Sequence, residues 1–223
     1  MLVSTLPNTS DYRFERKMPV ERLSVAAAIA LVRRHPAAFS EIYQQRTINS
    51  LYLDTVNHRC MHDAEEGIAE RYKVRVRWYN DDATSWLEFK VRSGLVQRKE
   101  RVELPGLNAV AASHAELNAA FAESALDAPV LQQLCGLTPS LCNTYERRYF
   151  LSADKRFRIT VDWGICYRRH PALNRPVASN PLRPSVVVIE LKYPTDADAD
   201  AGQISSVFPM RVGRYSKYVE GLR

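Results

Sequence analysis

Apolar and polar side chains alternate in several short segments of this chain. The clearest is Arg71–Tyr79, in which Lys or Arg occupies every second position from 71 to 77 and Tyr or Val lies between. Because successive side chains of a β-strand point to opposite faces, this alternation predicts strands with one apolar and one charged face. The predicted strands are Tyr12–Met18, Ile48–Asp54, Arg71–Tyr79, Thr84–Arg92, Leu95–Leu104, Thr144–Leu151, Arg156–Tyr167 and Val186–Tyr193.

Helical patterns are confined to the segments between these strands. Val20–Arg34 is rich in Ala and is followed by a proline, which cannot continue a helix. Ala109–Leu134 is rich in Ala and Leu and is predicted to form one or two helices, broken near Pro129. Asn57–Gly67 is polar and is expected to form at most one helical turn. Tyr215–Leu222 is predicted to be a short final helix.

The connections favour an antiparallel arrangement of the strands. Asn80-Asp81-Asp82 and Ser93-Gly94 have the turn chemistry of hairpins. About eight strands joined by hairpins or helical excursions predict an antiparallel α+β protein or a closed barrel, not a parallel sheet. Residues 1–10 are polar and are expected to be a disordered tail, so that the folded domain spans 11–223. A long irregular loop is expected around Pro171, Pro176, Pro181 and Pro184.

Composition limits the classes of partner and compartment. The 223 residues suit one domain, and the net charge of +6 indicates an anionic partner without identifying it. The four cysteines match no zinc or disulfide pattern. Neither a membrane-spanning apolar run nor a signal peptide is evident. We therefore expect a cytoplasmic protein that does not insert directly into a membrane.

Carboxylates recur among the cations of the charged faces. The dyad Glu-x-Lys occurs on three predicted strands, as Glu15/Lys17, Glu88/Lys90 and Glu190/Lys192. Mg²⁺ and Mn²⁺ take oxygen ligands from one or two carboxylates and from phosphate, while Lys and Arg neutralise the remaining phosphate charge. The alternative is a half-exposed sheet whose charged face is solvated and carries cross-strand ion pairs. The excess of cations favours a bound anion.

Eight short segments, in their order along the chain, resemble the VTC domain, the polyphosphate polymerase domain of vacuolar transporter chaperone proteins. They span nearly the whole chain and are Arg13–Lys17, Ser50–Asp54, Lys73–Tyr79, Leu87–Lys90, Thr144–Arg147, Arg158–Asp162, Ile189–Lys192 and Tyr215–Tyr218. That family belongs to the CYTH-like triphosphate tunnel metalloenzymes. The resemblance implies a closed eight-stranded antiparallel β-barrel, a triphosphate tunnel, with flanking helices.

The resemblance also implies roles for particular residues. The phosphate-binding residues would be Lys17, Arg75, Arg77, Lys90, Arg147, Arg158, Lys192 and Lys217. The catalytic residues among them would be Arg75, Arg77, Lys90, Arg147 and Lys217. Glu190 would hold Mn²⁺ or Mg²⁺, with Glu15 and Glu88 as helpers. Hydrolytic relatives begin with Glu-x-Glu-x-Lys, whereas Arg13 occupies the first of these positions here, which argues against a hydrolase-type metal arrangement.

The function expected from this resemblance is a metal-dependent transfer of the γ-phosphoryl group of ATP to inorganic polyphosphate. One alternative is a tripolyphosphatase or nucleoside triphosphatase, in which water is the acceptor, and another is a noncatalytic polyphosphate-binding module. The expected partners are ATP and inorganic polyphosphate or triphosphate. Nucleic acid is not expected, because its binding usually uses an open basic patch without interleaved carboxylates. The sequence leaves a membrane-protein partner open.

Overall fold

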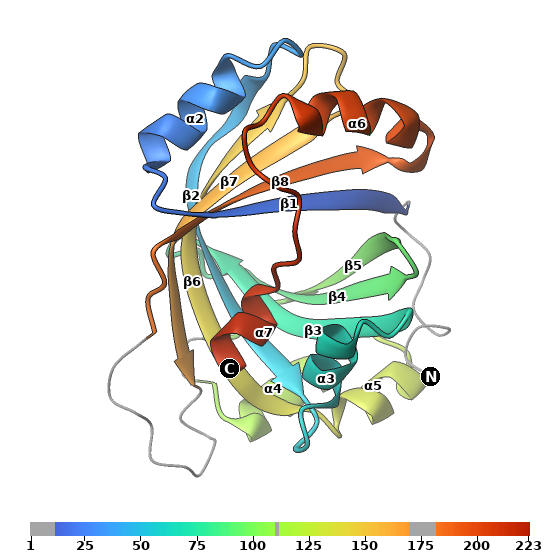
Figure 1. Ribbon diagram of the computed structural model, residues 1–223. Coiled ribbons are helices and arrows are strands. Elements are labelled where there is room, and N and C mark those ends of the chain that lie inside the picture. The colour runs from blue at the N-terminus through green and yellow to red at the C-terminus, as the bar shows by residue number, and fades with distance from the viewer. Residues whose placement is uncertain (1–11, 110–111, 170–181) are drawn as a thin grey trace.

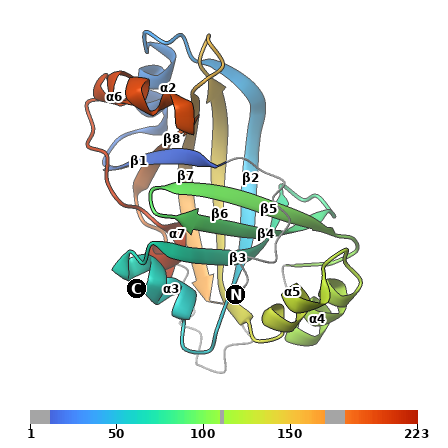
Figure 2. The same ribbon diagram turned by 90° about the vertical axis from the view of Figure 1, so that its right-hand side faces the viewer.

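Eight antiparallel strands form a closed ring in the computed structural model, which describes residues 12–109, 112–169 and 182–223 (Figures 1 and 2). The order around the ring is β1-β5-β4-β3-β2-β6-β7-β8. The strands are β1 (Arg13–Glu21), β2 (Ser40–Asp54), β3 (Glu70–Tyr79), β4 (Ser85–Ser93), β5 (Val96–Leu104), β6 (Thr138–Leu151), β7 (Arg158–Arg169) and β8 (Val186–Pro194). The predicted eight-stranded antiparallel α+β fold is thus confirmed.

The ring is closed unevenly. β1 pairs with β8 along its whole length, from Arg13 opposite Pro194 to Glu21 opposite Val186. At the other side of β1, the only described pair with β5 is Arg13 opposite Gln97. The seam between β1 and β5 is therefore held by far less backbone pairing than the rest of the ring.

Helices flank the ring and cover parts of its outer face. They are α2 (Val25–Arg33), α3 (Arg59–Glu66), α4 (His114–Ala122), α5 (Ala128–Leu134), α6 (Asp198–Ser206) and α7 (Lys217–Leu222), with a 3-10 turn at Thr195–Ala197. No helix within the described ranges combines the length and the apolar character needed to cross a membrane.

Several element boundaries differ from those predicted. The segment Val20–Glu21 extends β1, and α2 begins only after Ser24, whose side chain accepts a hydrogen bond from the Ala27 N–H. β2 begins eight residues before the predicted start at Ile48, because pairing with β6 overrides a polar local sequence. The expected single turn at Asn57–Gly67 is the helix α3, and α6 was not predicted at all.

Two predictions concern segments outside the described residues. These are the disordered tail at residues 1–10 and most of the irregular loop, including Pro171, Pro176 and Pro181.

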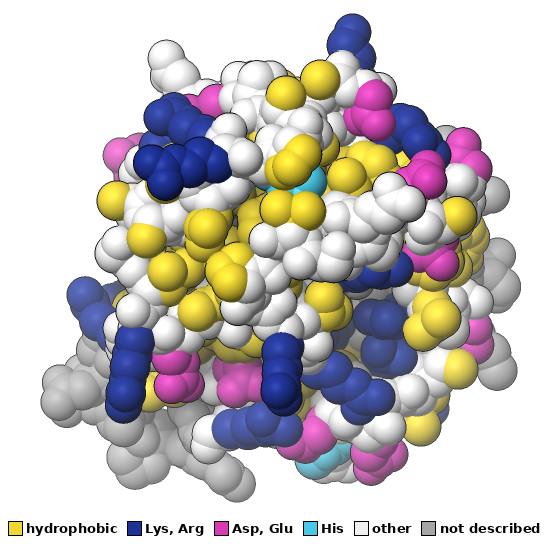
Figure 3. All heavy atoms as spheres, turned by 45° about the horizontal axis from the view of Figure 1, so that its top comes forward, with side chains coloured by type: hydrophobic (Ala, Val, Ile, Leu, Met, Phe, Trp, Pro, Cys, Tyr) yellow, Lys and Arg dark blue, Asp and Glu magenta, His cyan; other side chains and the backbone are white. Residues whose placement is uncertain are grey.

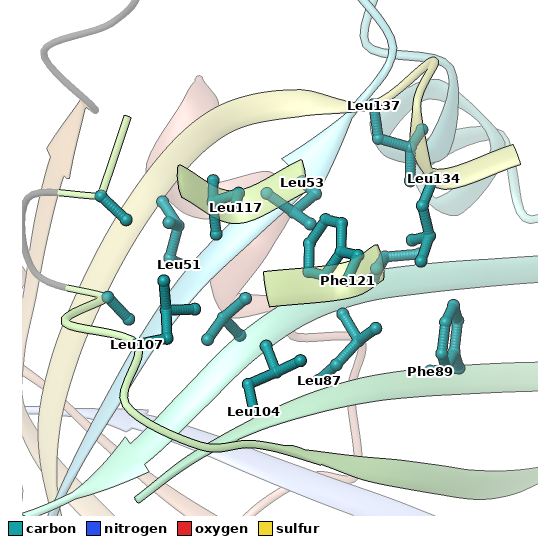
Figure 4. Packing of buried hydrophobic residues seen from close by; sticks show 14 of the residues in the cluster. Leu51, Leu53, Leu87, Phe89, Leu104, Leu107, Leu117, Phe121, Leu134 and Leu137 are labelled. Atoms are coloured by element: carbon teal, nitrogen blue, oxygen red, sulfur yellow. The ribbon is translucent and has the colours of Figure 1, made fainter. Parts of the chain in front are cut away.

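Most apolar strand side chains point outward, where two large cores bury them, and a third, smaller cluster includes Tyr218 of α7. Figure 4 shows the first core, in which α4 and α5 cover strands β2 to β5 through residues such as Phe121, Phe89 and Leu87. In the second core, α2 and α6 cover β1, β7 and β8, and apolar side chains show between these helices in Figure 3. The charged faces of the same strands consequently point into the ring.

The last helix, α7, closes part of the interior with aromatic side chains. The rings of Tyr218 and Tyr52 stack with centroids 4.6 Å apart, and the Tyr218 hydroxyl donates a hydrogen bond to the buried Asp54. Asp54 also accepts a hydrogen bond from the Cys60 N–H at the start of α3. These contacts fix α7 against the strands and thereby fix Lys217 at its start (Figure 1).

The close approach of α7 to the strands leads to a first prediction. A Cβ atom at Gly221 would lie 2.5 Å from Leu141 and 2.6 Å from the buried Tyr167 ring. We expect Gly221→Ala to lower the free energy of unfolding by about 1–3 kcal/mol, because overpacking forces side chains or backbone to shift. Denaturant unfolding measures this change.

Gly202→Ala is the matched control, because Gly202 lies in α6 with nothing within 4 Å of its added Cβ. This variant should be unchanged or more stable by up to about 1 kcal/mol, since Gly weakens helix interiors. Equal stability of the two variants would contradict the close packing of α7.

Candidate functional site

A basic cavity of about 460 Å³ occupies the interior of the ring. Among the described residues, thirteen Lys and Arg side chains and two carboxylates, those of Glu15 and Glu190, line it. The cations are Arg13, Lys17, Arg46, Lys73, Arg75, Arg77, Lys90, Arg98, Lys99, Arg147, Arg158, Lys192 and Lys217. All eight predicted phosphate-binding residues are among them. Their placement around one cavity is confirmed, while their roles stay predictions.

Strand alternation produces this arrangement. On β3, Arg75 and Arg77 line the cavity, whereas Val74 and Val76 between them are fully buried in the outer core. On β7, Arg158 lines the cavity and Ile159 is buried on the outside. The inner charged face and the outer apolar face are thus separated residue by residue, as the alternation predicted.

A buried carboxylate positions the arginines of β3. Glu88, which is fully buried on the neighbouring strand β4, lies 2.7 Å from Arg75, 3.5 Å from Arg77 and 2.9 Å from Lys99. Burial alone would raise the pKa of Glu88, but the cations hold it well below its ordinary value. Arg77 also donates hydrogen bonds to the Ser50 and Tyr145 hydroxyl oxygens.

Two further carboxylates position Arg147 and Lys217. The fully buried Asp162 on β7 accepts hydrogen bonds from both cations. Glu190 on β8 lies 3.2 Å from Arg147, 3.4 Å from Lys217 and 2.8 Å from Lys192. The pKa of Asp162 is low, because Arg147 and Lys217 outweigh the effect of burial. The two carboxylates therefore stay charged and hold both cations in the cavity wall.

Lys17 forms ion pairs with both Glu15 and Glu190. Its ammonium group lies 3.1 Å from Glu15 and 3.9 Å from Glu190. Burial would lower the pKa of Lys17, but these two carboxylates raise it. Glu15 is also 3.1 Å from Lys90. Lys17 and Lys217 therefore link Glu15, Glu190 and Asp162 into one network of ion pairs.

Other lysines remain incompletely compensated. Burial lowers the pKa of Lys73 to about 7, helped by the charges of Lys17 and Arg71. Burial likewise lowers the pKa of Lys192 to about 8, although Glu190 opposes it. Among the described residues, Lys73 has no carboxylate within ion-pair distance, and its ammonium group donates a hydrogen bond to Ser216. An anion in the cavity would supply the missing charge.

The carboxylates differ in how well they could hold a metal ion. The described residues contain no group of three or more His, Cys, Asp or Glu side chains with metal-site geometry. Glu15 and Glu190 nevertheless face the cavity, and one or two carboxylates together with phosphate oxygens suffice for Mg²⁺ or Mn²⁺. Glu88 is fully buried, and its two oxygens already bind Arg75 and Lys99.

Sequence reasoning missed some members of this site. Asp162 was placed on the charged face of its strand, but its position between Arg147 and Lys217 depends on contacts across the ring. Arg46 lies in the part of β2 that was not predicted as a strand. Lys99 lies in a run of charged residues, Arg98 to Arg101, in which alternation gives no signal.

A second cavity, of about 360 Å³, continues from the first. Six residues line both cavities, and they are Glu15, Lys17, Lys73, Lys90, Gln97 and Ser216. On β3, Arg71 lines only the second cavity, Lys73 lines both cavities, and Arg77 lines only the first. The two cavities therefore extend in opposite directions along β3 from the residues that they share.

Solved structures with the same fold identify the structural class. One similar structure is a putative adenylate cyclase from Bacillus halodurans, with 13% sequence identity, a TM-score of 0.55, and 94% of this chain and 96% of that chain covered. Another is a putative adenylate cyclase from Vibrio parahaemolyticus, with 13% sequence identity, a TM-score of 0.52, and 93% of this chain and 98% of that chain covered. A third is a putative adenylyl cyclase from Hippeastrum described as having a dominant triphosphatase activity. It has 14% sequence identity and a TM-score of 0.52, with 94% of this chain and 93% of that chain covered. The chain therefore has the same fold as these proteins.

The family follows from the sequence itself. The chain matches the VTC domain over residues 12–223 and belongs to that family. No curated protein matches the chain.

The lowered lysine pKa values predict a pH dependence of anion binding. With pKa values of about 7 and 8, Lys73 and Lys192 are partly neutral at pH 8. A bound polyanion favours their charged forms and raises both values, so binding should take up protons and weaken as the pH rises from 7 to 9. Calorimetry with tripolyphosphate in buffers of different ionisation enthalpy measures the uptake.

Lys73→Met isolates the proton uptake of Lys73. Any protonation of tripolyphosphate itself is the same with the variant and with the parent protein. We expect the variant to take up fewer protons than the parent at pH 8. Identical proton uptake by the two proteins would contradict the lowered pKa of Lys73.

Proposed function

We propose that this protein is a metal-dependent phosphotransferase that adds the γ-phosphoryl group of ATP to inorganic polyphosphate. The observation that carries the proposal is the pair of basic cavities that extend in opposite directions along β3 and share Lys17, Lys73 and Lys90. A donor triphosphate in one cavity and a polyphosphate chain in the other would meet at these shared cations.

The cations would act by binding and positioning both substrates. Arg75 and Arg77 are fixed by Glu88, while Arg147 and Lys217 are fixed by Asp162 and Glu190. Donors held in place before the substrate arrives need no reorganisation as charge develops in the transition state. We assign Arg75, Arg77, Lys90, Arg147 and Lys217 to this catalytic role and Lys17, Arg158 and Lys192 to phosphate binding.

The proposed transfer needs no nucleophile from the protein. A terminal phosphate oxygen of the acceptor chain forms a bond to the γ-phosphorus, and the bond from that phosphorus to the β-phosphate oxygen breaks, which releases ADP. Catalysis of phosphoryl transfer consists mainly of positioning and charge stabilisation. The dense cation network suits this kind of catalysis.

Mn²⁺ or Mg²⁺ would neutralise part of the triphosphate charge when bound. Glu190 is the ligand that we assign to it, with Glu15 as the second carboxylate, because both face the cavity and both contact Lys17. Glu88 is better suited to hold Arg75, since its oxygens are enclosed by cations.

A triphosphatase is the second candidate function. The Hippeastrum protein of similar fold is described as a triphosphatase, and water in place of the acceptor chain would use the same cations. Two observations support transfer over hydrolysis, namely the second cavity and Arg13, which lines the cavity where hydrolytic relatives have their first glutamate. A noncatalytic polyphosphate-binding module is the third candidate function.

Product analysis separates these functions. With ATP, Mn²⁺ and a short polyphosphate primer, we expect longer polyphosphate and ADP from the parent protein. Glu190→Gln should bind tripolyphosphate and remain folded, because Asp162 still holds Arg147 and Lys217, but it should lose most of the metal-dependent activity. Gel electrophoresis of the polymer and ADP release measure the outcome.

Glu103→Gln is the matched control, because Glu103 is exposed and outside both cavities. It should keep the activity of the parent. Orthophosphate release without longer polymer would establish the triphosphatase, and no turnover of ATP would leave only the binding module. Equal activity of Glu190→Gln and the parent would refute the metal assignment.

The length of the cation network predicts selectivity for linear oligophosphates. One phosphate can contact only a few of these cations, whereas a triphosphate can extend along the cavity. Each charge-assisted hydrogen bond contributes about 1.5–3 kcal/mol, and about 3 kcal/mol is more than a hundredfold in affinity. We therefore expect tripolyphosphate to bind at least about a hundredfold more tightly than orthophosphate, with a steep loss at high salt.

Arg158→Ala tests whether the cavity is the site. Among the described residues Arg158 has no carboxylate within ion-pair distance, so its removal leaves no buried acid without a partner. This variant should bind tripolyphosphate about tenfold more weakly, while the exposed Arg34→Ala should bind it normally. Similar affinities for ortho-, pyro- and tripolyphosphate would exclude one continuous site.

A further inference from the structure

Three tyrosines surround an arginine in the first cavity. The guanidinium carbon of Arg46 lies 5.2 Å from the ring centroid of Tyr43, 5.7 Å from that of Tyr79 and 5.9 Å from that of Tyr149. The rings of Tyr43 and Tyr149 meet edge to face with centroids 5.5 Å apart. All four side chains line the cavity. We call these four residues the tyrosine–arginine cluster.

Irregular pairing of β2 brings two of these residues to the same face. Tyr43 lies opposite Tyr149, and Arg46 lies opposite Arg147, so three steps along β2 match two along β6. In a regular strand, residues three apart point to opposite faces. The register shifts on both sides of Tyr43 turn its ring and Arg46 into the cavity. Bulges of this kind often re-aim side chains beside functional sites.

The cluster is built differently from the rest of the cavity wall. Glu15, Glu88, Asp162 and Glu190 hold most of the neighbouring cations, whereas within the described ranges no carboxylate lies within 4 Å of Arg46. Aromatic faces take the place of a counter-ion. The Tyr43 side chain remains exposed, with a relative accessibility of 47%. A flat ligand can therefore reach an aromatic ring and a guanidinium plane at this end of the cavity.

The cluster adjoins the phosphate-binding network. Tyr149 contacts Arg46 and also the guanidinium group of Arg147, which lies 5.9 Å from its ring centroid. The residues shared with the second cavity include none of the four members of the cluster. The cluster thus lies at the end of the first cavity that faces away from the junction, with Arg147 between it and the deeper cations.

We propose that the tyrosine–arginine cluster binds the nucleobase of the donor nucleoside triphosphate by stacking. This inference rests on the proposed function, because it places the donor in the first cavity with its phosphates directed towards Lys17 and Lys73. Aromatic rings and guanidinium planes stack on every base, so the subsite accepts purines and pyrimidines. It also fixes the direction of the substrate, with the base at the outer end and the γ-phosphate at the junction of the cavities.

The test compares a ligand that has a base with one that lacks it. Dissociation constants for ATP and tripolyphosphate, each with Mn²⁺, are measured by calorimetry for the parent protein, Tyr43→Ala and Tyr43→Phe. We expect Tyr43→Ala to weaken ATP binding about tenfold, a loss typical of one stacking contact, and to leave tripolyphosphate binding unchanged. Tyr43→Phe keeps the ring and should bind both ligands like the parent.

Arg46→Ala and Arg101→Ala form a matched pair. Both changes remove an arginine that lies over an aromatic ring, but Arg101 contacts Trp86 and lines neither cavity. Arg46→Ala should weaken ATP binding more than tripolyphosphate binding, and Arg101→Ala should change neither. Both Tyr43 variants should remain folded, because Tyr43 is half exposed at the end of its strand.

The possible outcomes distinguish failure of the base subsite from failure of the proposed function. Equal loss of ATP and tripolyphosphate binding in Tyr43→Ala, or no loss of either, would overturn the base subsite, while tight tripolyphosphate binding by the parent would still support the proposed function. Failure of the parent to bind either ligand would overturn both.

Discussion

The rest of this structure depends on the surplus of positive charge enclosed by the ring. Thirteen cations line the first cavity, and four acidic residues, Glu15, Glu88, Asp162 and Glu190, hold most of them in place. Each of these carboxylates contacts at least two cations. Like charges at such spacing repel, and burial makes the repulsion stronger because less water screens it. A polyanion bound inside the ring would offset this repulsion.

The outer cores make this arrangement stable enough to fold. In most sheets that bury one face, the apolar side points to the protein interior and the polar side points to water. Here the strands direct polar groups inward, and the helices α2, α4, α5 and α6 bury the apolar side on the outside. Burial of apolar surface contributes about 25 cal/mol per Å², which the two cores supply far from the charges. The apolar cores and the enclosed charge thus lie on opposite faces of the same strands.

This separation explains which features could be predicted from the sequence. Strict alternation on β3, β4 and β7 identified both faces, whereas the enclosure of Arg75, Lys90 and Arg158 in one cavity was implied by the resemblance to the VTC domain. Alternation carries no information where a strand is polar on both faces, as in the first half of β2, and so Arg46 was missed. It also cannot show which strands become neighbours in space. The role of Asp162 depends on Lys217, which is 55 residues away, and it becomes visible only in three dimensions.

The amount of enclosed charge bears on the kind of reaction that the ring can support. The surplus of cations over carboxylates in the cavity wall exceeds the negative charge of a single triphosphate, and a bound divalent metal would add to it. One donor nucleotide carries too little negative charge to offset this surplus. A second anion, bound where the two cavities meet, removes this imbalance. Water as the acceptor carries no charge and leaves the imbalance in place, whereas a polyphosphate chain brings a negative charge with every unit. Electrostatic complementarity therefore supports an anionic acceptor, and with it phosphoryl transfer over hydrolysis.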